Sequence, residues 1–237
     1  KLRITHQKLE RLHPADLADI MEELSPAERE AIIASVDKET AAEALAELDA
    51  RLTAQIVEKM DPEKAADIIE EMEPDAAADV LAGLTPETSR EVLSEMPRDE
   101  AQEVRELLKF EESTAGGMMN TDFVFVGEAA TRNEVVEWVR GRDVNLEQLD
   151  TVLVIDGQAR LSGVVAVARL LLAAGDQPLA ELKSEPLVSV RPDAEEKEVF
   201  ELFDKYNLRS LSVVDEDGRP MGAITVDDVV TRLCKKN

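Results

Sequence analysis

Apolar residues recur every twelve positions through the first half of this chain. The residue after each recurring position is usually an acid, a serine or a threonine, which can accept a hydrogen bond from a free N–H at a helix start. A proline often follows, where its missing N–H costs nothing and its fixed φ already suits a helix. The recurring positions are Leu12, Leu24, Val36, Leu48, Met60, Met72, Leu84, Met96 and Leu108. The spacing therefore predicts a series of short helices with one repeating pattern.

Helices of about ten residues are too short to persist alone in water, so the successive units must stack on one another. The repeat thus predicts an all-α superhelix of short helical hairpins. We place this acidic helical-repeat domain at residues 1–115, because the twelve-residue register fails near Phe110 and a glycine-containing joint follows at 111–120. Regular apolar spacing reports packing rather than chemistry, so the repeat by itself also fits a purely structural scaffold.

The second half of the chain has a different composition, which predicts an α/β domain. Runs of β-branched and aromatic residues at 123–126, 152–155 and 211–214 are typical of strands. They alternate with helical patterns at 132–140 and 195–206.

This α/β half also repeats internally. Val124, Val126 and Val135 recur as Val188, Val190 and Val199, 64 residues later. Each copy has the predicted order strand, helix, strand, turn, strand, helix. We place the first copy at about 116–176 and the second at about 182–237.

The composition excludes several classes of protein. A formal net charge of −25 argues against nucleic-acid binding, which needs clustered Lys and Arg to neutralise phosphates. Cys234 is the only cysteine, so the chain has no disulfide framework and fits a cytoplasmic location. The most apolar stretch, 164–174, is interrupted by Arg169 and is too short to span a membrane. Because the chain begins without methionine, we expect a fragment whose missing flanks would carry any membrane attachment.

No residue pattern indicates catalysis. His6 and His13 have no nearby serine or cysteine with which to form a nucleophilic relay. We therefore predict a protein that is not an enzyme.

The second α/β copy, at 213–218 and 222–228, resembles a cystathionine-β-synthase-type (CBS) repeat, so the two copies together resemble a tandem CBS pair. Acidic helical repeats come first, and the segment Phe-Glu-Glu-Ser-Thr-Ala-Gly-Gly-Met-Met at 110–119 precedes the pair. This order is similar to that of the cytosolic region of the MgtE family of magnesium transporters. The resemblance covers nearly the whole chain, and it implies a multidomain protein with an all-α superhelix followed by an α/β tandem CBS domain pair.

The same resemblance implies a function. The chain would be a Mg²⁺-sensing regulatory region that closes a pore when Mg²⁺ bridges the helical and CBS domains. It would form a homodimer through the CBS pair, continue into a transmembrane pore domain, and lie on the cytosolic side of the inner or plasma membrane. The alternative is a soluble, stand-alone CBS regulator or scaffold that binds an adenine nucleotide.

Paired carboxylates are the candidate metal ligands. Asp75 and Asp79 lie at i and i+4 of one predicted helix, where like charges repel unless a cation intervenes. Mg²⁺ prefers oxygen ligands and usually contacts only one or two carboxylates. The resemblance implies that Glu43, Asp75 and Asp79 match acids that face the CBS domain, and that Asp228 matches the acid they meet there. The alternative is that all four are solvated surface acids.

The sequence differs from the family elsewhere on the predicted CBS surface. Lys197, Asn207 and Thr231 stand where the family carries further acids. Lys197 reverses the charge at its position and Thr231 removes a carboxylate.

A Thr-x-x-Asp pattern marks a candidate nucleotide site. In CBS pairs its hydroxyl reaches a phosphate and its carboxylate accepts hydrogen bonds from ribose, and the second copy supplies Thr225 and Asp228. The first copy has Ala166 and Arg169 at these places, so one of the two possible sites is expected to be lost. We favour metal at Asp228, because an acidic surface without clustered Arg or Lys is poorly suited to a triphosphate. A nucleoside monophosphate or adenosine is the alternative ligand for this site.

Overall fold

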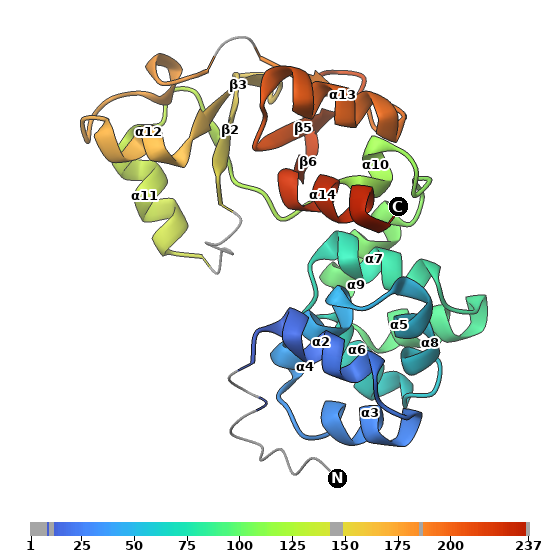
Figure 1. Cartoon of the computed structure of the whole chain (residues 1–237). Helices are drawn as coiled ribbons and strands as arrows, with labels where there is room; N and C mark the ends of the chain where they lie inside the picture. Colours follow the sequence, from blue (N-terminus) through green and yellow to red (C-terminus); the bar gives the residue numbers. More distant parts are fainter. Residues whose placement is uncertain (1–8, 10–11, 143–148, 185–186, 236–237) are drawn as a thin grey trace. The chain divides into compact units, whose positions relative to one another are not determined.

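The computed structural model (Figure 1) describes Leu9 and residues 12–142, 149–184 and 187–235. The chain forms two compact units, Lys1–Lys109 and Phe110–Asn237. His6 lies outside the described residues. No helix in the described part of the chain has the length and apolar character that a membrane span requires.

The first unit is made of short helices whose starts follow the sequence pattern. Prolines stand in the first turns of five of the described helices, as predicted. Several of the predicted N-cap residues also cap their helices, although Glu73 forms no side-chain cap hydrogen bond. The Asp37 carboxylate, for example, accepts a hydrogen bond from the Thr40 N–H at 2.8 Å. The described helices are α2 (Pro14–Glu22), α3 (Pro26–Ile33), α4 (Lys38–Glu47), α5 (Ala50–Val57), α6 (Pro62–Ile69), α7 (Pro74–Ala82), α8 (Pro86–Glu95) and α9 (Arg98–Leu107).

The helices of this unit pack mainly on their next-but-one neighbours. Helix α4 packs on α2 and α6, α8 packs on α6, and α7 packs on α5 and α9. The core between them is apolar, and several of the residues at the twelve-residue positions are buried in it, including Leu48, Met72 and Met96. Leu84 is buried as well, whereas the remaining positions stay partly exposed: Leu12, Leu24, Val36, Met60 and Leu108. The predicted superhelix of short hairpins is thus confirmed, and its register sets which side chains the core receives.

The second unit contains two three-stranded sheets of the same design. In each, the first two strands are parallel and the second and third are antiparallel, with strand orders β1-β2-β3 and β4-β5-β6. This architecture confirms the predicted tandem α/β pair. The first copy contains α10 (Ala115–Met118), β1 (Phe125–Gly127), α11 (Arg132–Arg140), β2 (Thr151–Ile155), β3 (Leu161–Ala166) and α12 (Val167–Leu172). The second contains η1 (Leu179–Glu181), β4 (Ser189–Val190), α13 (Glu196–Tyr206), β5 (Ser210–Val214), β6 (Pro220–Thr225) and α14 (Val226–Lys235).

The two copies exchange edge segments. The Asn120 N–H, from the leading segment of the first copy, donates to the carbonyl of Ala223 on β6 of the second copy, at 2.9 Å. The Ser184 N–H, 64 residues later, donates to the carbonyl of Val164 on β3 of the first copy, also at 2.9 Å. Each sheet is therefore extended by the leading segment of the other copy.

The glycine pair of the joint is explained by close packing. A Cβ on Gly116 would lie 2.6 Å from the Phe110 ring, and one on Gly117 would lie 2.3 Å from the carbonyl oxygen of Glu111. The Gly116 N–H donates to the carbonyl of Pro192 at 2.8 Å, which ties the joint to the start of the second copy. Only glycine fits both positions.

A carboxylate from one helix of the first unit caps another. Glu58, at the C-terminal end of α5, accepts hydrogen bonds from the Thr85 N–H at 2.5 Å and from the Thr88 hydroxyl at 3.0 Å. Both donors belong to the start of α8, where a negative charge also interacts favourably with the positive end of the helix dipole. The Thr85 N–H, and to a lesser extent the Thr88 hydroxyl, lower the pKa of Glu58 below its usual value.

We predict that Glu58→Gln destabilises the helical unit in a pH-dependent way. A carboxyl group with a lowered folded pKa stabilises the protein above its unfolded pKa, and that contribution is lost as the pH falls through the folded pKa. The variant should therefore melt below the parent at neutral pH, and the two melting temperatures should converge in acid. Thermal unfolding followed by circular dichroism at several pH values tests this, with Glu63→Gln on exposed α6 surface as the control. A gap in melting temperature that does not narrow in acid would refute it.

Candidate functional site

The start of α14 holds the candidate nucleotide pair. Thr225 ends β6 and Asp228 lies in the first turn of the helix that follows. The Thr225 hydroxyl donates to Asp228 Oδ2 at 2.5 Å, and the Thr225 N–H points to the same oxygen at 3.4 Å. The Thr-x-x-Asp spacing thus brings the two side chains together, because residues three apart share one side of a helical turn.

The electrostatics of Asp228 are those of a partly buried carboxylate. Burial raises its pKa above the usual value, and the hydrogen bond from Thr225 opposes the increase. The neighbouring Asp227 carboxylate raises the pKa further, whereas the Arg232 guanidinium lowers it. A cation or a set of hydrogen-bond donors placed against Asp228 would favour its charged form.

Arg232 is a residue of this region that the sequence analysis did not identify. Its guanidinium donates to the carbonyl of Glu112 at 3.1 Å and to the carbonyl of Gly117 at 3.0 Å. The side chain therefore fastens the joint segment to α14, one helical turn after Asp228. The only sequence signal was an arginine four residues after a candidate acid, which does not reveal a partner more than a hundred residues away.

The first copy lacks the hydroxyl and carboxylate of this pair. Ala166 provides no side-chain cap at the start of α12, and Arg169 instead donates to the carbonyl of Leu182 at 3.2 Å. At these places the second copy thus has two side chains bonded to each other, whereas the first copy has an arginine bonded to a backbone carbonyl.

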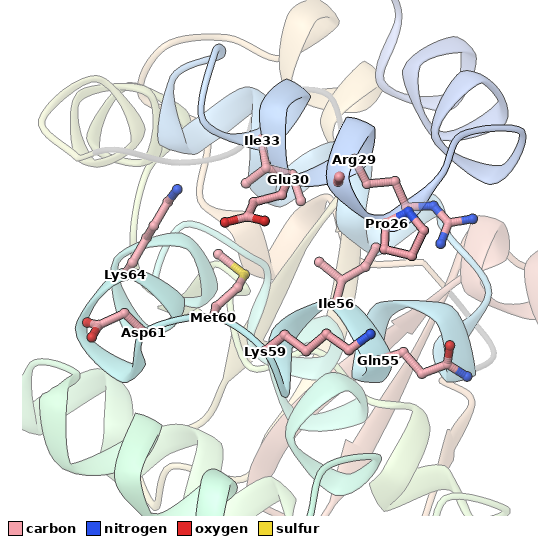
Figure 2. Close-up of a pocket in the computed structure, with 11 residues that line it drawn as sticks. Pro26, Arg29, Glu30, Ile33, Gln55, Ile56, Lys59, Met60, Asp61 and Lys64 are labelled. Atoms are coloured by element: carbon pink, nitrogen blue, oxygen red, sulfur yellow. The ribbon is translucent and has the colours of Figure 1, made fainter.

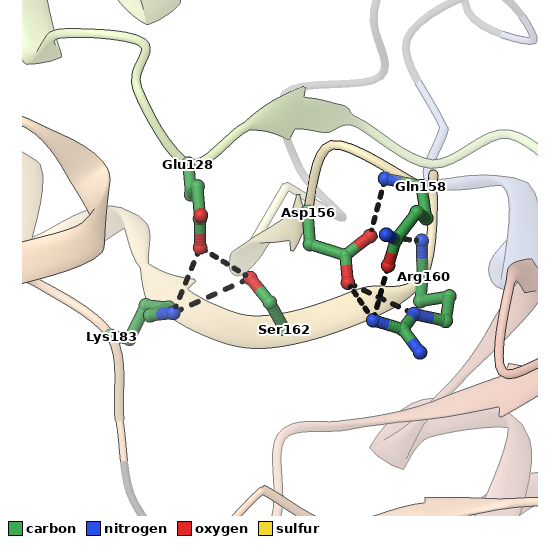
Figure 3. Close-up of polar contacts among 6 residues, drawn as sticks. All are labelled: Glu128, Asp156, Gln158, Arg160, Ser162 and Lys183. Atoms are coloured by element: carbon green, nitrogen blue, oxygen red, sulfur yellow. Dashed lines mark hydrogen bonds and ion pairs between the residues drawn. The ribbon is translucent and has the colours of Figure 1, made fainter.

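Figure 3 shows that other polar groups of the first copy are used locally. Asp156 accepts hydrogen bonds from the Gln158 and Arg160 backbone N–H groups at 2.8 and 3.0 Å, and Arg160 Nη2 pairs with its other oxygen at 2.8 Å. These contacts, the Arg160 N–H first, hold the pKa of Asp156 below its usual value. Lys183 Nζ reaches Glu128 and Ser162 at 3.4 Å each. These residues stabilise a turn and a sheet edge, and we assign them no ligand.

The candidate metal ligands of the helical unit lie on helices that pack together. Glu43 is exposed on α4, whereas Asp75 in the first turn of α7 is partly buried and Asp79, one turn later, is exposed. Helix α4 packs against α7. Asp228 belongs to the other unit. Within the residues that the structure describes, no group of three or more His, Cys, Asp or Glu side chains is arranged to hold a metal ion.

Three positions differ from the family, and the local structure explains two of them. Asn207 ends α13 with a left-handed conformation, at φ 52°, which asparagine adopts more readily than most residues. Lys197 Nζ lies 3.8 Å from Glu201 Oε1, on the next turn of the same helix. Thr231 is exposed on α14, and nothing in its surroundings explains it.

Comparisons with known proteins cover both units. The protein-family model of the MgtE intracellular N domain matches residues 12–113, and that of the CBS domain matches residues 179–235. The magnesium transporter MgtE of Thermus thermophilus is 37% identical over 130 residues, which are 55% of this chain and 29% of that protein. The MgtE of Enterococcus faecalis is 28% identical over 127 residues, 54% of this chain and 28% of that protein. The matched segment thus spans less than a third of these relatives.

Solved structures match over almost the whole chain. A crystal structure of the cytosolic domain of the Mg²⁺ channel MgtE in complex with ATP is 31% identical, with a TM-score of 0.90 over 96% of this chain and 93% of that one. A crystal structure of the soluble part of a magnesium transporter is 24% identical and has a TM-score of 0.89, over 98% of this chain and 91% of that one.

Proposed function

Because this chain belongs to the MgtE family, of which it forms the cytosolic region, we propose that it is the Mg²⁺-sensing regulatory region of a magnesium transporter. The observation that carries the proposal is the nearly full-length match, at 31% identity, to the cytosolic domain of a Mg²⁺ channel. The role is regulatory, with no catalytic step. The transmembrane pore that it would control belongs to a longer chain, on whose cytosolic side this region would lie.

The acids of the helical unit support the proposal. Glu43 lies on α4 and the Asp75 and Asp79 pair on α7, and these two helices pack together, so we propose that their carboxylates share one surface. Hydrated Mg²⁺ suits such a surface, because it keeps several waters and needs only one or two carboxylates from each side. We propose that Asp228 supplies the carboxylate from the CBS pair.

The proposed mechanism is electrostatic. When Mg²⁺ is scarce, the carboxylates of the two units repel each other and the open state is favoured. When Mg²⁺ is abundant, bridging ions favour the closed state because they bind it more tightly. A nearly complete shift between two states takes on the order of 5 kcal/mol of differential affinity, so several weakly bound ions acting together fit better than one.

We expect Mg²⁺ to protect the joint at 111–120 from proteolysis, and Asp75→Asn with Asp79→Asn to weaken that protection. The amides keep the shape of the side chains but remove the charges that hold the ion. The measurement is the cleavage rate across a Mg²⁺ titration, and the midpoint should rise at least about tenfold, since a charged partner is lost at each position. A double change of equal charge on α6, Asp67→Asn with Glu63→Gln, should leave the midpoint unchanged. Equal protection of all three proteins would contradict the proposal.

A second candidate function is favoured by the Thr225 and Asp228 pair. The hydroxyl and carboxylate lie together at a helix start, and a related cytosolic domain was crystallised with ATP. In this alternative, the chain is a stand-alone CBS regulator or scaffold that binds an adenine nucleotide through these two residues.

Calorimetry with AMP and ATP tests the nucleotide site. Asp228→Ala should weaken nucleotide binding at least about tenfold, because two ribose hydroxyls lose a charged acceptor. Asp227→Ala removes an exposed neighbouring charge and serves as the control. Nucleotide binding that is lost in Asp228→Ala and insensitive to Mg²⁺ would favour the stand-alone regulator. The absence of a binding isotherm in the parent would rule this site out.

We also propose that the CBS pair forms a homodimer. Leu171 and Leu172 on α12 are 75% and 92% exposed, and Val230 on α14 is 52% exposed. In the later part of each copy, equivalent residues are 59 apart, as Gly163 and Gly222 are, because the first copy carries five extra residues before it. Leu171 and Val230 have this spacing, so they occupy equivalent places in the two copies. Large exposed apolar side chains at matching places fit an isologous interface with a second copy.

Sedimentation equilibrium tests the dimer. Leu171→Glu with Val230→Glu should give a monomer, because burying two carboxylates in the interface is unfavourable. Tyr206→Glu, on the exposed surface of α13, should leave the dimer intact. A parent protein that is monomeric at all accessible concentrations would exclude the proposal.

A further inference from the structure

A cavity of about 350 Å³ opens in the helical unit between α3, α5 and the start of α6 (Figure 2). Its apolar lining includes Ile33, Ile56 and Met60. Figure 2 shows α3 on one side of the opening and α5 and α6 on the other, with Lys59 and Lys64 at its edge. Cavities of this size are typical of sites for small organic molecules.

The cavity exists because α3 breaks the repeat. Counting in steps of twelve, the place of Arg29 is filled elsewhere by small or apolar residues that are buried, such as Leu17, Ala41 and Ala65. The Arg29 guanidinium instead donates to the carbonyls of Met21 and Glu22, at 2.7 and 3.1 Å. Helix α3 lacks the close packing onto α5 that the other described next-but-one pairs show. A core position is thus occupied by a cation, and the space between the helices stays open.

Two lysines at this cavity also break the acidic pattern of the repeat. At the place of Lys59, four other repeats carry a glutamate, at Glu23, Glu47, Glu71 and Glu95. At the place of Lys64, three others carry Asp16, Glu28 and Glu100.

These lysines are exposed, and neither forms an ion pair with any described residue. By contrast, Lys38 pairs with both Glu70 and Glu71. In a chain with a net charge of −25, it is unusual that two lysines which pair with no described acid lie beside one apolar cavity.

We propose that this cavity binds a small amphiphilic anion, with its alkyl part on Ile33, Ile56 and Met60 and its carboxylate or phosphate at the edge of the cavity, paired with Lys59 or Lys64. The positive side chains complement the head group, and the apolar lining complements the tail. Two acids also line the cavity. Asp61 is engaged as the cap of α6, where it accepts the Glu63 N–H at 3.2 Å, while Glu30 stays exposed and opposes the anion. The site is independent of the proposed Mg²⁺ ligands.

Calorimetric titration of the whole chain with sodium decanoate, below its micelle concentration, tests the proposal. Lys59→Glu with Lys64→Glu restores acids that the repeat tolerates elsewhere, and it should weaken binding at least about tenfold. Arg51→Glu with Arg98→Glu changes the net charge equally, outside the cavity, and should bind as the parent does. Glu30→Gln should tighten binding, and decanol, which has the same chain without the charge, should bind more weakly than decanoate.

Four results would overturn the proposal. They are no saturable binding of decanoate to the parent, equal binding to the lysine and arginine double variants, decanol binding as tightly as decanoate, and unchanged or weaker binding to Glu30→Gln. Self-association of the chain that is lost in the lysine double variant, without decanoate binding in the parent, would assign the cavity to an acidic helix of a second copy. Circular dichroism of each variant, matched to that of the parent, shows that a lost affinity is not a lost fold.

Discussion

The helical unit depends on the burial of one helix face against next-but-one neighbours. The helices that the structure describes in it are eight to ten residues long, a length at which backbone hydrogen bonds alone do not hold a helix in water. Packing supplies the missing stability, and the twelve-residue register places apolar residues at equivalent positions of successive helices. Any surface function of this unit, including carboxylates on α4 and α7, therefore relies on core residues such as Leu45 and Leu81.

Local features of this fold could be predicted from the sequence because they are decided within a few residues. The proline at a helix start and the aspartate or threonine before it act on neighbouring N–H groups, so their spacing is sufficient evidence. The order of strands and helices in the CBS pair was predicted for the same reason. The Thr225 to Asp228 hydrogen bond follows from a spacing of three residues at a helix start.

Contacts between distant segments could not be predicted. The hydrogen bonds of Arg232 to the joint, and the cap that Glu58 provides to α8, link residues whose proximity only the packed structure reveals. Arg29 illustrates a further case: its repeat position was available in the sequence, but only the packing of α3 shows that a cation there leaves a cavity. The side chains proposed to hold Mg²⁺ stay predictions, because their roles depend on charge and geometry beyond a single helix.

The exchange of edge segments between the two CBS copies has a consequence for how this half of the chain can be divided. Asn120 completes the sheet of the second copy, and Ser184 completes the sheet of the first copy. A fragment that starts after Asn120, or one that stops before Ser184, would expose unpaired backbone on a strand that is covered in the intact pair. The smallest autonomous piece of this half is therefore the entire pair with its leading joint, and a single copy excised at its apparent sequence limits would be incomplete.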